Sequence, residues 1–362
     1  MQALGFAFQQ SGLISAIVWI DHFIAFPAMP DLTIAALEGV LPASLAITLD
    51  TLAAANRMAA QAGQRELSWR VVGSSASVPL GHGLSLAAEP LSPRLRLGRS
   101  VLVVPGLQLL PPEPTRGARR PDMHGYLVER IGRPDARCLA ALMQAHHARG
   151  QVLAASCSSV LLMGEAGLLD GRTATTHWAI AGLLQARYPQ CRVDATRMVV
   201  EDERLISAGA AMAQMDLMLL LLGRCMGHRV AERVMRYLLL DSRPSQSTYA
   251  VWSQLAVQDG IVGRIEAIVE ARLPDAPGLA ELAAQLHVSE RTLARRVQRA
   301  TGQTPLVLIQ AVRLRRARHL IETTRLPLAE VAAQVGYTDP SGLHRLTSKV
   351  LRTAPGRLRP SR

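Results

Sequence analysis

Lysine, aromatic residues and paired cysteines are scarce in this 362-residue chain. Lys349 is the one lysine among 40 cationic side chains, an arginine bias that we attribute to genome base composition rather than to function. Aromatic residues make up 4%. The four cysteines (Cys138, Cys157, Cys191 and Cys225) are widely spaced and form no CxxC pair, which argues against a zinc site and a disulfide framework and suits a reducing cytoplasm. We therefore expect no metal and no cofactor.

A long uninterrupted apolar run is also missing. The best candidate, residues 13–29, contains Asp21 and His22, ends in prolines and has no basic region before it. We interpret residues 1–30 as a poorly specified extension, with a membrane anchor as the minor alternative. The expected protein is cytoplasmic and has no membrane partner.

A tandem repeat occupies the last quarter of the chain. Residues 279–286 recur as residues 328–335, at an offset of 49 positions, and Leu293, Arg295 and Pro305 recur 50 positions on. Each copy consists of a short apolar helix, a polar turn and a second helix, so the sequence predicts two helix-turn-helix units. Ser289 and Thr338 stand where the second helices begin, and we expect both to cap them.

The second helix of each copy carries basic residues on the face away from its core. In the first copy, Arg291, Arg295 and Arg299 recur every four residues as one outward stripe. Such a row suits the DNA major groove, although one basic helix face alone is as often merely solvated. The residues that we expect at DNA are Ser289, Arg291, Thr292, Arg295, Arg296 and Arg299 in the first copy and Ser341, His344, Arg345 and Lys349 in the second.

The segment between the copies favours one binding face. Residues 304–323 read as a helix, with Thr304 as cap and Pro305 at the first position. At ~1.5 Å per residue it spans about 30 Å, close to one turn of B-DNA. From Asp275 onward there are 15 Lys+Arg and 6 Asp+Glu, so most of the net charge of +12 lies here. Promoter DNA is the predicted partner.

Strands and helices alternate ahead of the repeat. Strands are predicted at residues 32–37, 67–73, 100–104 and 151–155, with helices at 44–60 and 135–149 and a Pro/Arg-rich loop at 111–121. This order predicts an α/β fold with a flavodoxin-like, doubly wound parallel sheet, followed by an all-α domain.

Cys157 stands at the sharp turn between the strand at 151–155 and the following helix, with small residues around it. A tight strand-to-helix turn lifts the sulfur above the sheet edge, where ligands bind in open α/β sheets. Gly106 ends a neighbouring strand at the same edge. Buried inert cysteines are common, so this fragment by itself leaves a functional thiol and a structural one equally open.

Two family resemblances follow from these motifs. The segments at 282–284, 289–296, 301–305, 331–337 and 354–359 resemble the DNA-binding domain of the AraC family of bacterial transcription regulators. Thr347, Leu343 and Arg352 depart from that family's pattern, which predicts a looser second unit. Residues 165–178 resemble the stretch after the cysteine in PfpI-like domains of the class I glutamine-amidotransferase-like superfamily, and that resemblance extends over residues 31–240.

The resemblance implies specific roles in the first domain. An acid from the first strand–helix region would approach Cys157, and Asp50 is the best match. Enzymatic members need an activating His, often directly after the cysteine, but Ser158 stands there, and His177 looks more structural. The two domains together resemble the GlxA group of regulators, in which the first domain senses a small molecule or dimerises.

We therefore predict a transcription regulator and not an enzyme. Its expected parts are an extension (1–30), a ligand-sensing PfpI-like domain (31–240), a linker (241–257) and an AraC-type DNA-binding domain (258–362) whose first helix is 262–272. The ligand pocket would lie near Asp50, Gly106, Cys157, Ser158 and His177. A homodimer is expected, with an unknown small-molecule effector and RNA polymerase as a further candidate partner. The alternatives are a hydrolase or hydratase with Cys157 as nucleophile and Asp50 as acid/base, and a redox or electrophile sensor at Cys157.

Overall fold

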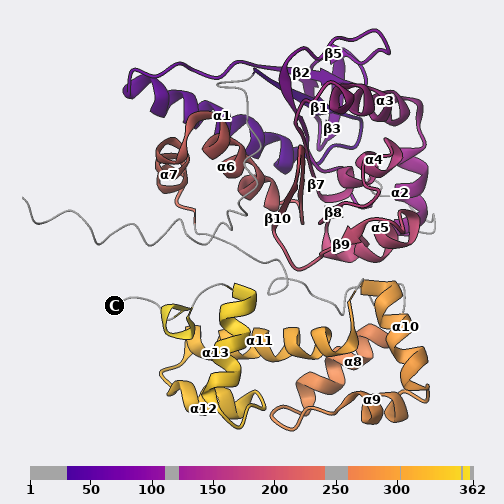
Figure 1. Ribbon diagram of the computed structural model, residues 1–362, viewed down its shortest axis with the longest axis vertical. Coiled ribbons are helices and arrows are strands. Elements are labelled where there is room, and N and C mark those ends of the chain that lie inside the picture. The colour runs from indigo at the N-terminus through magenta and orange to yellow at the C-terminus, as the bar shows by residue number, and fades with distance from the viewer. Residues whose placement is uncertain (1–30, 111–121, 241–259, 302, 352–353, 359–362) are drawn as a thin grey trace, which may run out of the picture.

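The computed structural model describes residues 31–110, 122–240, 260–301, 303–351 and 354–358. Its helices and strands form an α/β part that ends with Tyr237 and an all-helical part that begins at Gly260, and this confirms the predicted fold class (Figure 1). The predicted extension 1–30, loop 111–121 and linker 241–257 lie outside the described residues. Within those residues, every helix is too short or too polar to span a bilayer.

The α/β part is built on a seven-stranded sheet in the order β10-β11-β7-β6-β1-β2-β5. Its strands are β1 (Asp31–Ala36), β2 (Trp69–Gly73), β5 (Glu89–Pro90), β6 (Ser100–Val104), β7 (Leu153–Ser156), β10 (Val199–Asp202) and β11 (Leu205–Ala208). β6 and β7 are buried along their whole length, as expected for central strands. The pairs are parallel except β10–β11, which is antiparallel. The prediction of a parallel sheet is corrected at that edge, because only two residues join β10 to β11.

Helices cover both faces of this sheet, with α1, α6 and α7 on one side and α2, α3 and α4 on the other (Figure 1). The helices are α1 (Pro42–Gln61), α2 (Met123–Ile131), α3 (Pro134–Ala148), α4 (Val160–Glu165), α5 (Ala181–Arg187), α6 (Ala213–Met226) and α7 (His228–Tyr237), with 3-10 turns η1 (Cys157–Ser159) and η2 (Trp178–Ile180). Two small two-stranded sheets flank the large one: β3 (Ser77–Gly81) with β4 (Leu84–Ala87), and β8 (Thr173–Ala174) with β9 (Arg192–Val193).

The helical part contains the two predicted helix-turn-helix units. Its elements are α8 (Gly260–Ala271), α9 (Leu279–Gln285), α10 (Glu290–Thr301), α11 (Pro305–Thr323), α12 (Leu328–Gln334), α13 (Pro340–Leu351) and the 3-10 turn η4 (Pro355–Leu358). One apolar core joins α8, α9, α10 and the first half of α11, and another joins α12 and α13 to the second half. The repeat in the sequence thus corresponds to two small cores at opposite ends of one helix.

Candidate functional site

The first recognition helix, α10, is capped and oriented as its sequence predicts. Ser289 Oγ accepts a hydrogen bond from the Thr292 amide at 3.2 Å. Leu293 and Val297 are fully buried and hold the inner face against the core. The stripe residues Arg291, Arg295 and Arg299 are all exposed, whereas Thr292 and Arg296 are half-buried. This helix therefore presents a row of guanidinium groups to solvent.

The second recognition helix, α13, begins with a different cap from the predicted one. The carboxylate of Asp339, not Thr338, accepts the Ser341 amide at 2.8 Å, because the helix begins at Pro340. Ser341, His344 and Arg345 are exposed, and Lys349 lies further along the same helix.

Thr347 occupies a core position of this second unit and is completely buried. Its hydroxyl donates to the carbonyls of Leu343 and His344, at 3.0 and 2.9 Å. The polar group that is predicted to loosen this core therefore has hydrogen-bond partners inside its own helix.

The connecting helix α11 uses most of its arginines inside the molecule. Arg315 pairs with Glu266, Arg318 pairs with Glu322, and the Arg313 guanidinium lies 5.5 Å from the centre of the Tyr337 ring. Arg316 is exposed. Arg315 thus ties α11 to α8 and Arg313 ties it to the turn after α12, whereas Arg318 pairs within α11.

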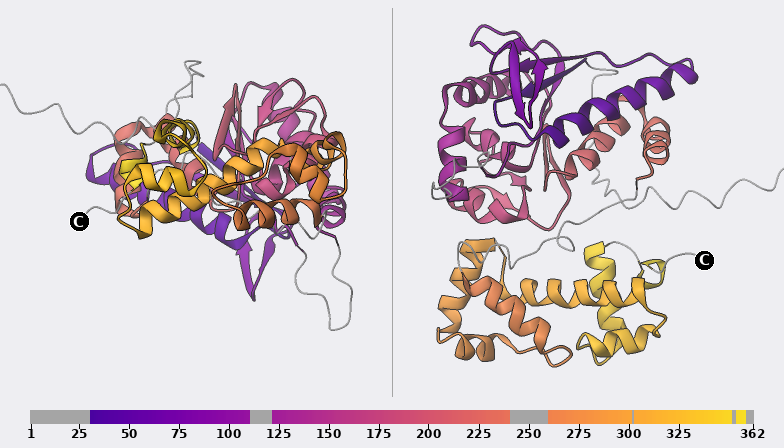
Figure 2. Two further views of the ribbon diagram at one scale, coloured as in Figure 1. Left: turned by 90° about the horizontal axis from the view of Figure 1, so that it is seen from below. Right: turned by 180° about the vertical axis from the view of Figure 1, so that it is seen from behind.

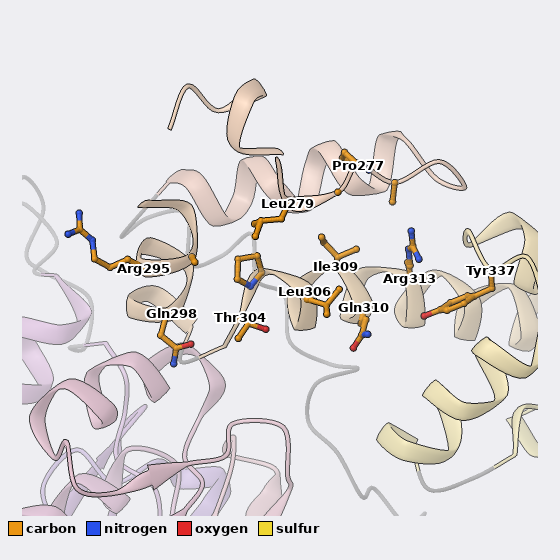
Figure 3. Close-up of a pocket in the computed structure, with 14 residues that line it drawn as sticks. Pro277, Leu279, Arg295, Gln298, Thr304, Leu306, Ile309, Gln310, Arg313 and Tyr337 are labelled. Carbon is orange, nitrogen blue, oxygen red and sulfur yellow. The ribbon is translucent and has the colours of Figure 1, made fainter. Parts of the chain in front are cut away.

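A cavity of about 670 Å³ runs along α11, from α10 to Tyr337. Arg295 and Gln298 of α10 stand at one end, and Arg313 with Tyr337 stands at the other (Figure 3). Its lining includes Pro277, Leu279, Pro305, Leu306 and Ile309, and Leu306 is 63% exposed. One end of this cavity is therefore formed by Arg295, a side chain predicted to contact DNA.

The second candidate site is the elbow, residues 156–159, where β7 turns into α4. Cys157 has a φ of 54°, a left-handed backbone conformation that residues other than glycine rarely adopt. Gly106 allows this turn, because a Cβ on Gly106 would come within 2.7 Å of the Cys157 Cβ. The hydroxyls of Ser158 and Ser159 donate to the carbonyls of Leu107 and Pro105, at 2.6 and 2.7 Å. These bonds fix the elbow to the loop that follows β6.

Neither the Cys157 thiol nor the His177 imidazole is set up for chemistry in this conformation. Cys157 is 2% exposed, and this burial raises the pKa of its thiol to about 11, so the thiol is protonated at neutral pH. Burial lowers the pKa of His177 to about 4. The Nδ1 atom of His177 accepts the Ala179 amide at 3.0 Å and so caps η2.

Comparisons with known proteins agree with this two-part architecture. The family described as "Helix-turn-helix domain" matches residues 282–361, and the DJ-1/PfpI family matches residues 132–224. The chain is similar to the HTH-type transcriptional regulators GbdR and CdhR of Pseudomonas aeruginosa, with 29% and 33% identity, and GlxA of Rhizobium meliloti, with 27%. These matches cover 66%, 50% and 56% of this chain and 66%, 54% and 63% of the relatives, so the chain spans less than two thirds of their length.

The chain is therefore similar to HTH-type transcriptional regulators, and it combines a match to the DJ-1/PfpI family with a C-terminal match to a helix-turn-helix family. These two matches correspond to the two parts of the fold. The helix-turn-helix match contains both recognition helices, and the DJ-1/PfpI match contains the elbow.

The predicted pocket residues come together only in part. Gly106, Cys157 and Ser158 meet at the elbow. Asp50 is exposed and lies two turns into α1, which packs against α6 and α7, so the structure does not bring its carboxylate to the thiol. The acid that follows β1 directly is Glu38, which is exposed and lies near Arg133.

Three residues that the sequence does not indicate also matter for the site. The Thr176 hydroxyl donates to the Cys157 carbonyl at 2.6 Å. Trp178 packs in the core of the first helix-turn-helix unit, and Gly182 lies against the backbone of Arg299. Thr176 and Trp178 flank His177 in the resembling stretch, but no local pattern indicates that they contact elements this far away in the sequence.

Proposed function

We propose that this protein is a transcription regulator that binds specific promoter DNA through α10. The α13 helix would make a second contact, one turn of the DNA double helix away. The observation that carries the proposal is the exposed stripe of Arg291, Arg295 and Arg299 on a capped helix-turn-helix recognition helix. Arginine pairs bidentately with guanine edges in the major groove and also grips phosphate. The α11 helix has 19 residues and spans about 28 Å, which suits two successive grooves.

The test measures binding of the full chain to a duplex selected from random sequences. Arg295→Ala should weaken binding to the selected duplex by about 1–3 kcal/mol, roughly 5- to 150-fold, and leave binding to unrelated duplexes nearly unchanged. Arg137→Ala, which removes an exposed arginine of α3, is the charge-matched control and should change neither. An equal loss on all duplexes would make Arg295 a phosphate contact, and no loss on any would contradict the proposal.

The α/β part would sense a small-molecule effector at the elbow and form the homodimer. The support at the elbow is Ser156, whose hydroxyl is fully buried beside Gly106 and has no hydrogen-bond partner among the described residues. A polar ligand at this sheet edge would satisfy that hydroxyl. A metabolite that binds here should raise the melting temperature of the native chain but not that of the Ser156→Val variant. An equal rise in both would mean that the metabolite binds elsewhere.

The alternative functions at Cys157 have less support. Cysteine catalysis needs a thiolate and a base within hydrogen-bond reach. A protonated thiol, a His177 occupied as a cap and an Asp50 on the surface provide neither in this conformation. A redox sensor likewise needs an accessible thiolate, and Cys157 is 2% exposed.

A further inference from the structure

The first helix-turn-helix unit shares its apolar core with the α/β part. Trp178 and Ala179 of η2 are each 7% exposed and belong to the same buried cluster as Val262, Leu293 and Val297. Figure 1 and the right-hand view of Figure 2 both show α10 ending beside α5. The core of the first unit is therefore completed by residues of the other domain.

Gly182 in α5 allows the two helices to approach backbone to backbone. A Cβ built on Gly182 would lie 2.2 Å from the Arg299 carbonyl oxygen and 3.3 Å from the Ala300 carbonyl carbon. A side chain can rotate away from such a clash, but backbone atoms cannot. Glycine inside a helix is less favourable than alanine, and this close contact explains why glycine stands here.

The same segment is attached to the elbow at its other end. The hydroxyl of Thr176, fully buried, donates to the Cys157 carbonyl at 2.6 Å. Thr175 is also fully buried, and its amide donates to Ser207 Oγ at 2.9 Å. The His177 cap then orders the turn that carries Trp178. Residues 175–182, the coupling segment, thus form a short and continuous connection from the elbow to α10.

We propose that the coupling segment makes the position of the first recognition helix depend on the state of the elbow. Arg291 and Arg295 remain exposed while α10 is docked, so docking sets where this helix sits rather than covering its DNA-binding face. A ligand that favours one elbow conformation would shift α10 between docked and released positions, provided it binds the two states with different affinity. The regulatory meaning of this coupling rests on the proposed function, but the coupling itself is measured without DNA.

Hydrogen exchange of the full chain, read by mass spectrometry, tests the docking. Gly182→Ala should speed exchange in residues 178–182 and in the second half of α10, because the added methyl cannot fit against the Arg299 backbone. The matched control is Gly223→Ala in α6, where a Cβ would meet its nearest neighbour at an ordinary 3.5 Å. Unchanged exchange in α10 of a folded Gly182→Ala variant would show that α10 is not docked in solution.

The coupling is tested by Thr176→Val, which keeps the shape and removes the hydroxyl. Losing one buried hydrogen bond should speed exchange about five- to tenfold at residues 178–182 and in α10, which the coupling segment contacts through Trp178 and Gly182. Thr51→Val, which removes a buried hydroxyl of α1 that bonds to Ile47, should leave these segments unchanged. Faster exchange confined to residues 155–160 would overturn the coupling, and this variant decides the proposal if Gly182→Ala does not fold.

These outcomes are separate from those of the proposed function. Protected α10 amides that respond to both variants would support the coupling even if Arg295→Ala had no effect on DNA binding. Conversely, a large Arg295 effect together with unresponsive α10 amides would keep the DNA-binding function and remove the coupling.

Discussion

At the scale of single residues, Cys157 combines a left-handed backbone with a buried thiol. Gly106 makes room for this conformation, and the hydroxyl of Thr176 holds the cysteine carbonyl. The folded state therefore favours the neutral thiol. Since its pKa is raised above the usual value near 8.5, this preference stabilises the fold below about pH 8.5 and is lost as the pH rises toward 11.

This protonated thiol gives a prediction for alkylation. Iodoacetamide reacts with the thiolate, so the rate at Cys157 should be very low at pH 7 and rise about tenfold per pH unit up to about pH 11. Site-resolved mass spectrometry measures it, with the more exposed Cys138 as an internal comparison. A rate that reaches its plateau near pH 7 would mean a stabilised thiolate and would favour the enzyme or sensor alternatives.

Sequence reasoning mostly succeeded where the deciding interaction is local, although it placed the cap of α13 at Thr338 and the structure places it at Asp339. Ser289 and Thr304 cap helices that begin one residue later, and the repeat places Leu293 and Leu343 in equivalent cores. It did not place Asp50 correctly. The face of α1 that meets the sheet edge is set by packing against α6, and residues close to Asp50 in the sequence do not determine it.

At the scale of elements, α11 shows the same limit. Its arginines look alike in the sequence, yet Arg315 reaches Glu266 of α8, which is 3% exposed, while Arg316 faces solvent. Only the packing of α8 on α11, 49 positions apart at this pair, distinguishes them. Gly182 is a similar case, since its close partner is supplied by a different domain.

The ion pair between α8 and α11 gives a prediction for stability. Arg315→Ala would leave the buried Glu266 carboxylate without its guanidinium partner and should lower the free energy of unfolding by about 1–3 kcal/mol, less than for a fully buried pair because Arg315 is 30% exposed. Arg316→Ala should stay within about 0.5 kcal/mol. Chemical denaturation of both variants measures the difference, and equal losses would show that the pair does not hold α8 to α11.

At the scale of the whole molecule, the two recognition helices are not equivalent. The first shares a core with the α/β part through Trp178, whereas the second packs on α12 and the far half of α11. In the proposed coupling, a conformational change at the elbow would therefore shift α10 directly. It would shift α13 only through α11. Because one continuous helix of 19 residues joins the units, their spacing on DNA should be fixed.

Operator spacing tests this rigidity. Two contact elements about 10 base pairs apart should be needed on one face of the selected duplex. Inserting 5 base pairs between them turns the second element to the opposite face of the duplex. The affinity should then fall to that of the first unit alone, and Arg345→Ala should not lower it further. An insertion of 10 base pairs should not restore binding, because α11 cannot lengthen, and the same insertion outside the elements is the control. Full affinity after either internal insertion, with the Arg345 effect retained, would mean that the two units move independently.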